Sequence, residues 1–211
     1  MHVPDGILPV SVTLSGYVVS AGIAWLCLHR IKQRHDPRED IPRAALLTAA
    51  FFLASLIHIP APPASVHLVL NGLLGVLLGL FAFPAILIGL CFQAIMFGHG
   101  GLTTLGINGV ILGGPALLAA FVFSLGRRHH INGRKTAIAG FLAGSSAVAL
   151  SALLFALVIV TNLATHLRAD TEQSALLALL LAHLPLVLLE GAVTALVVTF
   201  IGRTRPHLLK G

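Results

Sequence analysis

The chain has 211 residues, of which 57% are hydrophobic and only 9% are charged. An ordinary soluble domain carries about 25% charged residues, so this composition excludes a soluble globular protein and indicates a polytopic membrane protein. The net charge of +6 does not indicate a nucleic-acid partner, because the charges stand in short clusters between apolar runs.

Seven apolar segments follow one another along the chain. Crossing a bilayer takes about 20 helical residues, and each segment is long enough to cross or nearly cross. We therefore expect an all-α fold, a bundle of seven transmembrane helices that forms one substrate-binding domain over residues 1–211. The expected helices cover approximately residues 10–29, 43–59, 66–82, 84–98, 105–126, 136–161 and 174–202.

The basic residues predict the orientation of this bundle. Residues 30–43, 127–135 and 203–210 hold five, four and three of the 13 Lys and Arg residues, and seven crossings would place all three clusters on one side. Only Arg168 falls on the other side. Cytoplasmic loops are enriched in Lys and Arg, so we expect the N-terminus outside and the C-terminus in the cytoplasm.

The segment before the first helix, residues 1–9, is predicted to chelate a metal ion. No basic residue precedes the first apolar run, so we expect no cleaved signal peptide, and the bulky His2 should protect Met1 from removal. The α-amine of Met1, the peptide nitrogen between Met1 and His2, and Nδ1 of His2 can close adjoining five- and six-membered chelate rings. Ni(II) and Cu(II) displace a peptide proton readily, and planar all-nitrogen coordination is diagnostic of these ions.

A turn should direct this chelating end toward the bundle. Pro4 fixes φ, Asp5 can bond its own backbone, and Gly6 accepts a positive φ. A fixed terminus loses less conformational entropy on binding than a loose one. The turn therefore favours a preorganised site.

A planar site has room for a fourth nitrogen, which another histidine on the outer side could supply. The best local context is SVHLVLN, where Ser65 could cap the third helix and His67 would face Asn71 one turn later. Spacing alone leaves the other outer histidines as alternatives, namely His58, His99, His166 and His183, and Asn108 is a further polar residue at the same end.

Four segments carry a resemblance to a known family: MHVPDGIL, SVHLVLNGLLGVLLG, CFQAIMFGHGGLTTLGINGV and HLPLVLLEGAVTALVV. They resemble the substrate-binding membrane component (the S component, CbiM/NikM family) of energy-coupling-factor nickel/cobalt transporters, over nearly the entire chain. The resemblance implies that Met1, His2 and His67 bind Ni²⁺ or Co²⁺ at the extracytoplasmic face. Asp5, Asn71 and His99 are candidates to support these ligands or to gate the site.

The resemblance also implies partners. These are a coupling transmembrane subunit, two ATPase subunits and a small accessory membrane subunit, in the bacterial or archaeal inner membrane. The glycine-rich GHGGLTTLG lacks the lysine of a nucleotide-binding P-loop, so ATP hydrolysis would occur on another chain and this chain would be no enzyme. No cofactor beyond the transported ion and no nucleic acid are expected. Glu190, inside the last helix, needs a partner or a proton, and its role stays open between packing and coupling.

Two alternatives from other classes stay open. One is a stand-alone metal permease or sensor without ATPase partners. The other is an intramembrane hydrolase, but the sequence has no HExxH motif, and Gly144-Ser145-Ser146 is too generic to indicate a serine peptidase.

Overall fold

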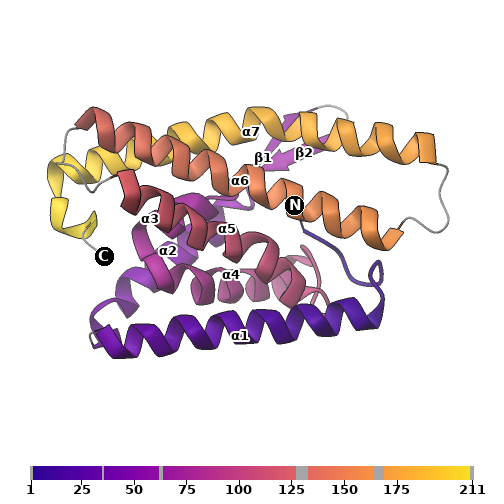
Figure 1. The fold of residues 1–211 in the computed structure, drawn as a ribbon, viewed down its shortest axis with the longest axis horizontal. Coiled ribbons are helices and arrows are strands. Elements are labelled where there is room, and N and C mark those ends of the chain that lie inside the picture. Colours follow the sequence, from indigo (N-terminus) through magenta and orange to yellow (C-terminus); the bar gives the residue numbers. More distant parts are fainter. Residues whose placement is uncertain (1, 35, 62–63, 127–132, 164–168, 210–211) are drawn as a thin grey trace.

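The computed structural model describes residues 2–34, 36–61, 64–126, 133–163 and 169–209. These residues form seven α-helices, three short 3₁₀ turns and one β-hairpin (Figure 1). The helices are α1 (Val10–Arg34), α2 (Ile41–Ala54), α3 (Asn71–Leu78), α4 (Ala82–Phe97), α5 (Leu105–Gly126), α6 (Gly133–Leu163) and α7 (Ala169–Thr204). The 3₁₀ turns are Pro37–Glu39, Gly79–Phe81 and Pro206–Leu209, and the strands are β1 (His58–Ala61) and β2 (Ala64–His67).

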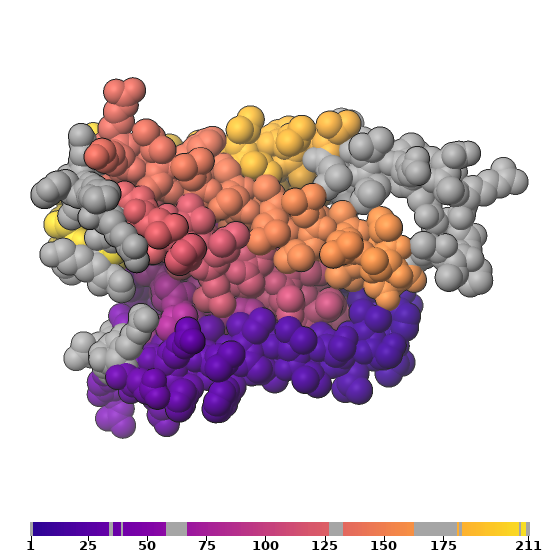
Figure 2. Space-filling view, in the orientation of Figure 1, coloured from indigo at the N-terminus to yellow at the C-terminus, as the bar shows by residue number. Residues whose placement is uncertain are grey.

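Helix α5 is at the centre of the bundle, where it packs against α1, α3, α4 and α6. Helices α6 and α7 pack along each other on one side of it, and α1 lies on the opposite side (Figure 1). Figure 2 shows α1 along the lower edge of this face and α6 above it. All eight residues of α3 are buried, so this short helix forms part of the interior.

Five stretches are long and apolar enough to cross a membrane, and α2 is a shorter apolar helix. The five are Val10–Gln33, Asn71–Phe97, Leu105–Gly126, Gly133–Asn162 and His183–Thr204. Large apolar side chains of α1, such as Leu14 and Val18, are about two-thirds exposed, as a lipid-facing helix requires. These helices explain the high content of hydrophobic residues, and they indicate a multi-pass membrane protein.

The close packing of α5 depends on glycine. A Cβ atom on Gly106 would overlap the backbone of α1 at Tyr17, and one on Gly16 would overlap Ile107. A Cβ on Gly75 would overlap the Ala116 carbonyl of α5. In a membrane no hydrophobic force drives helices together, so their association depends on close packing, which small residues allow.

The predicted ends of the second and third helices were wrong. The expected helix over 43–59 ends at Ala54, and the expected helix over 66–82 begins only at Asn71. Between them, β1 and β2 pair antiparallel, with His58 opposite His67. Pro60 disfavours a helix, and the β-branched Ile59 and Val66 favour strands. Ser65 therefore lies in a strand and does not cap α3.

The break between α3 and α4 comes earlier than the sequence suggested. Gly79, with φ of +55°, ends α3, and Pro84 lies inside the first turn of α4, where its missing N–H costs no helical bond. His67 before α3 and His99 after α4 approach each other. The chain therefore turns back between them and forms a helical hairpin.

Candidate metal site

The backbone of Val3 is fixed by side chains of α5 and of the residue just before it. Its N–H donates to Asn108 Oδ1 at 2.9 Å, and its carbonyl accepts from Asn108 Nδ2 at 3.0 Å. The Thr104 hydroxyl donates to the same carbonyl at 2.7 Å. Val3 is fully buried, so these bonds are shielded from water. They hold the N-terminal segment, and with it the adjacent His2, in one position.

Asp5 makes a second attachment to the same place. Its carboxylate accepts hydrogen bonds from the backbone N–H of Leu102, Thr103 and Thr104 at 2.9–3.3 Å, and from the Thr103 hydroxyl. These N–H groups precede α5, where an anion satisfies donors that the helix cannot. The Thr103 hydroxyl, with the backbone donors, lowers the pKa of Asp5. The predicted turn is confirmed, with Gly6 at φ +82°, but the Asp5 carboxylate bonds residues 102–104 where the sequence suggested its own backbone.

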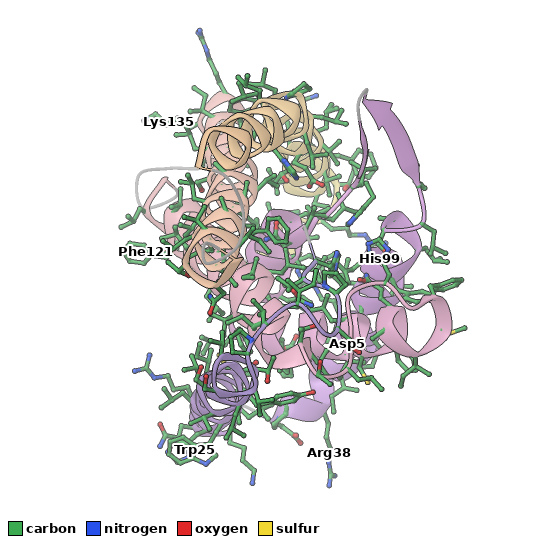
Figure 3. The ribbon with its side chains drawn as sticks, turned by 90° about the vertical axis from the view of Figure 1, so that its right-hand side faces the viewer. Asp5, Trp25, Arg38, His99, Phe121 and Lys135 are labelled. Carbon is green, nitrogen blue, oxygen red and sulfur yellow. The ribbon has the colours of Figure 1, made fainter. Side chains whose placement is uncertain are left out.

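The glycine-rich loop, residues 98–101, is shaped to receive the N-terminal segment. A Cβ on Gly101 would overlap the Asp5 carboxylate, and one on Gly100 would press on Asn108 and approach His2. Gly98 and Gly100 have φ of +60° and +82°, which favours glycine. Figure 3 shows Asp5 and His99 on the same side of the bundle.

Three imidazoles meet beside these attachments. His2 comes from the N-terminal segment, His67 from the end of β2 and His99 from the glycine-rich loop. One possible ligand atom from each lies within 4.8 Å of the others. Nε2 of His67 and Nε2 of His99 are 3.3 Å apart. Imidazole nitrogen suits Ni, Cu, Co and Zn, so this cluster is a candidate metal site.

The structure fixes the orientation of His67. Its Nδ1 is 3.0 Å from the carbonyl of Leu68, which can only accept, so Nδ1 carries the proton in this contact. Nε2 of a neutral His67 then presents its lone pair toward His99. A backbone carbonyl that fixes the tautomer in this way is typical of histidines that bind metals.

Glu190 of α7 supports the segment that follows His67. Its carboxylate accepts from the backbone N–H of Val69 and of Leu70, the latter at 2.9 Å. Leu70, with φ of +52°, precedes α3, so Glu190 satisfies backbone donors at the start of that helix. The partner that the sequence required for Glu190 is thus the backbone of Val69 and Leu70, next to the site.

His2 is half-buried, but both of its ring nitrogens are buried, and neither has a hydrogen-bond partner in the described part of the chain. Burial lowers the pKa of His2 well below its usual range, and the nearby His67 and His99 act in the same direction. The Gln93 side chain acts the opposite way, and its amide is buried beside His2 without a partner of its own. Metal binding requires neutral imidazole, which this environment favours.

The other predicted residues have different outcomes. Met1 and His166 lie outside the described residues. Asn71 is fully buried, but its amide donates to the Leu112 carbonyl and to Ser151, so it ties α3 to α5 and α6. The expected pairing of His67 and Asn71 on one helix was wrong, because His67 lies in a strand.

Sequence reasoning missed Gln93 and Thr104 and gave Asn108 no specific role. Each is a buried polar residue, and each contacts the N-terminal segment or lies beside it. Gln93 and Asn108 stand in otherwise apolar helices, where a polar side chain is a signal of function. That signal could have identified both.

A chain with this helical membrane fold and a cluster of three histidines has the features of a transition-metal transport component. The family of the cobalt uptake substrate-specific transmembrane region matches residues 2–208, and this chain belongs to that family. It is 32% identical to the cobalt transport protein CbiM of Sorangium cellulosum, over 99% of this chain and 94% of that protein. It is 33% identical to the fused nickel transport protein NikMN of Rhodobacter capsulatus, over 99% of this chain and 64% of that protein. A crystal structure of a transition metal transporter has the same fold, with a TM-score of 0.81 at 23% identity over 97% of this chain and 93% of that one.

Proposed function

We propose that this chain captures Ni²⁺ or Co²⁺ at the extracytoplasmic face of the membrane for ATP-driven uptake. The observation that carries the proposal is the convergence of His2 and His67, which fixed hydrogen bonds hold in place. Membership of the cobalt-uptake family supports the same chemistry. The metal is the transported substrate and no resident cofactor.

The proposed ligands are the Met1 amine, the peptide nitrogen between Met1 and His2, Nδ1 of His2 and Nε2 of His67. The attachments at Val3 and Asp5 preorganise this set, because they fix the chain one and three residues after His2. Preorganisation reduces the entropy lost on binding. Asp5 and Asn71 support the arrangement and do not bind the metal.

The proposed topology has seven crossings, with the N-terminus outside and the C-terminus in the cytoplasm. Figure 1 is consistent with it, since the end of α1, the start of α6 and the end of α7 lie at the same end of the bundle. Those three places adjoin the basic clusters of the sequence. In this orientation the chelating segment faces the outside.

Energy for transport would come from partner chains, namely a coupling transmembrane subunit and two ATPase subunits. A small accessory membrane subunit would complete the assembly in the bacterial or archaeal inner membrane. The fused NikMN relative supports an additional component, because 36% of that protein lies outside the part that matches this chain. ATP binding would alter how the loaded protein packs on the coupling subunit and release the ion inward.

Two measurements test this function. The purified His67→Ala variant should lose at least about 10-fold in Ni²⁺ or Co²⁺ affinity while the bundle stays folded. Unchanged affinity would rule out His67 as a ligand. In cells, deletion of the ATPase genes should abolish uptake of radioactive nickel or cobalt, whereas full remaining uptake would favour a stand-alone permease.

A further inference from the structure

The three imidazole rings are not equivalent in orientation. The rings of His2 and His67 are inclined by only 30° to each other. The ring of His99 stands nearly perpendicular to both, at 77° to His2 and 78° to His67. The rings of His2 and His67 are thus closer to parallel, and the ring of His99 differs in orientation from both.

The separation of two ring nitrogens is also informative. Nitrogen donors lie about 2.0–2.1 Å from a first-row metal ion, so neighbours at a right angle in one plane are about 2.8–3.0 Å apart. Nε2 of His67 and Nε2 of His99 are 3.3 Å apart. Two donors on one ion at that separation subtend about 105–110° at the metal. This angle fits a donor above the plane better than one within it.

We propose that His99 is a further metal ligand, which binds from the apical direction, above the plane of the proposed nitrogen donors of Met1, His2 and His67. The inference rests on the proposed function, because it requires the planar nitrogen site. It adds a fifth nitrogen to that site.

The loop that carries His99 is built to hold it there. The His99 N–H donates to the Gln93 carbonyl at 3.1 Å and so closes the end of α4. Gly98, at φ +60°, turns the chain, and Gly100 allows the loop to lie against His2. His99 therefore reaches the cluster from α4, independently of the N-terminal segment and of β2.

A fifth nitrogen changes which metal the site prefers. Four nitrogens in a plane suit the d⁸ ion Ni(II), whose filled axial orbital repels an apical donor. The d⁷ ion Co(II) has one electron in that orbital and accepts the donor more readily. His99 thus shifts the selectivity of the site toward Co²⁺ and acts as a specificity-determining residue.

The test uses the full-length purified protein with Co²⁺ and Ni²⁺ offered together. We expect His99→Ala and His99→Gln to lower the retained cobalt-to-nickel ratio by about 10-fold or more while nickel stays bound. Met96→Ala is the matched control, because Met96 is exposed near the end of α4, the helix that leads into the His99 loop, and should leave the ratio unchanged. An unchanged ratio in both His99 variants would overturn the proposal.

Electron paramagnetic resonance of the Co(II)-loaded protein gives a signature that a structural role would not produce. One apical ¹⁴N should split the cobalt hyperfine lines into triplets, which become doublets with ¹⁵N-histidine and disappear in His99→Ala. A wild-type spectrum without this splitting would overturn the apical ligand. A wild-type protein that retains neither metal would instead overturn the proposed function itself, so the two failures are distinguishable.

Discussion

The N-terminal segment and helix α1 are neighbours in the chain, but different forces hold them. The segment is fixed by directional hydrogen bonds from Asn108, Thr104 and the backbone before α5. Helix α1 exposes most of its large apolar side chains and contacts α5 through small residues. Apolar burial is non-directional and tolerates small shifts, whereas hydrogen bonds fix a position. The N-terminal segment, which carries the proposed ligands, is therefore held by hydrogen bonds.

Among changes to the N-terminal segment and α1, loss of the Asp5 carboxylate should have the largest effect on metal affinity. Asp5→Ala removes the acceptor for four donors before α5 and leaves the chelating end free to move. We expect metal affinity to fall by about 10- to 100-fold, the range for residues that orient ligands. Competition titration of the purified protein measures it. Wild-type affinity in Asp5→Ala would show that the turn does not position His2.

The pH dependence of this attachment has a definite sign. The folded protein lowers the pKa of Asp5, so its contribution is complete above the pKa of the unfolded chain and is lost as the pH falls through the lowered value. The stability difference between wild type and Asp5→Asn should therefore be constant near neutral pH and shrink only in acid. Thermal unfolding in detergent at a series of pH values measures this difference. A difference that disappears already near pH 7 would contradict it.

The Glu190 contact should affect stability and, through His67, metal binding. Glu190→Leu leaves the N–H groups of the buried Val69 and the half-buried Leu70 without their acceptor, at about 1–3 kcal/mol for an unsatisfied buried group. Glu190→Gln keeps one acceptor oxygen and should lose less. Thermal unfolding in detergent compares the two variants. Equal stability of both variants and wild type would argue against the contact.

A methyl group in the glycine-rich loop should have a smaller effect. Gly101→Ala places a Cβ atom where the Asp5 carboxylate lies, so the carboxylate must shift. We expect metal affinity to fall less than in Asp5→Ala, and the double variant to be no weaker than Asp5→Ala alone, because both changes act on one contact. Additive losses would indicate two separate effects.

The smallest effect is expected from changes in helix α1. Leu14→Ala and Val18→Ala shorten side chains of α1 that are about two-thirds exposed. Stability should change by no more than about 0.5 kcal/mol and metal affinity should not change. A loss of affinity in either variant would mean that α1 helps to place the ligands.

The sequence predicted most of the helical fold, because long apolar runs have few other solutions in a membrane. It also predicted the turn at Asp5 and Gly6. The β-hairpin was missed because its strands adjoin the apolar runs of α2 and α3, and short apolar runs read as either helix or strand. Pro60 and the β-branched Ile59 and Val66 were the local signals for strands.

The site could be predicted only in part. His2 could be selected from local chemistry, but spacing could not choose among the outer histidines, since their approach depends on how distant segments pack. The contact between Glu190 and Val69 joins residues 121 positions apart. Nothing in local sequence encodes such a contact, whereas the polar Gln93 and Asn108 in apolar helices were visible signals.

The central claim is that the free N-terminus binds the metal, and one measurement tests it most directly. A single residue added before Met1 converts the chelating amine into a peptide and moves the new amine away from His2. Elemental analysis of protein purified from nickel- and cobalt-supplied cells should then find metal in wild type and in a control with one glycine added after Gly211. It should find none in the N-terminally extended protein, and full metal content in that protein would contradict the account.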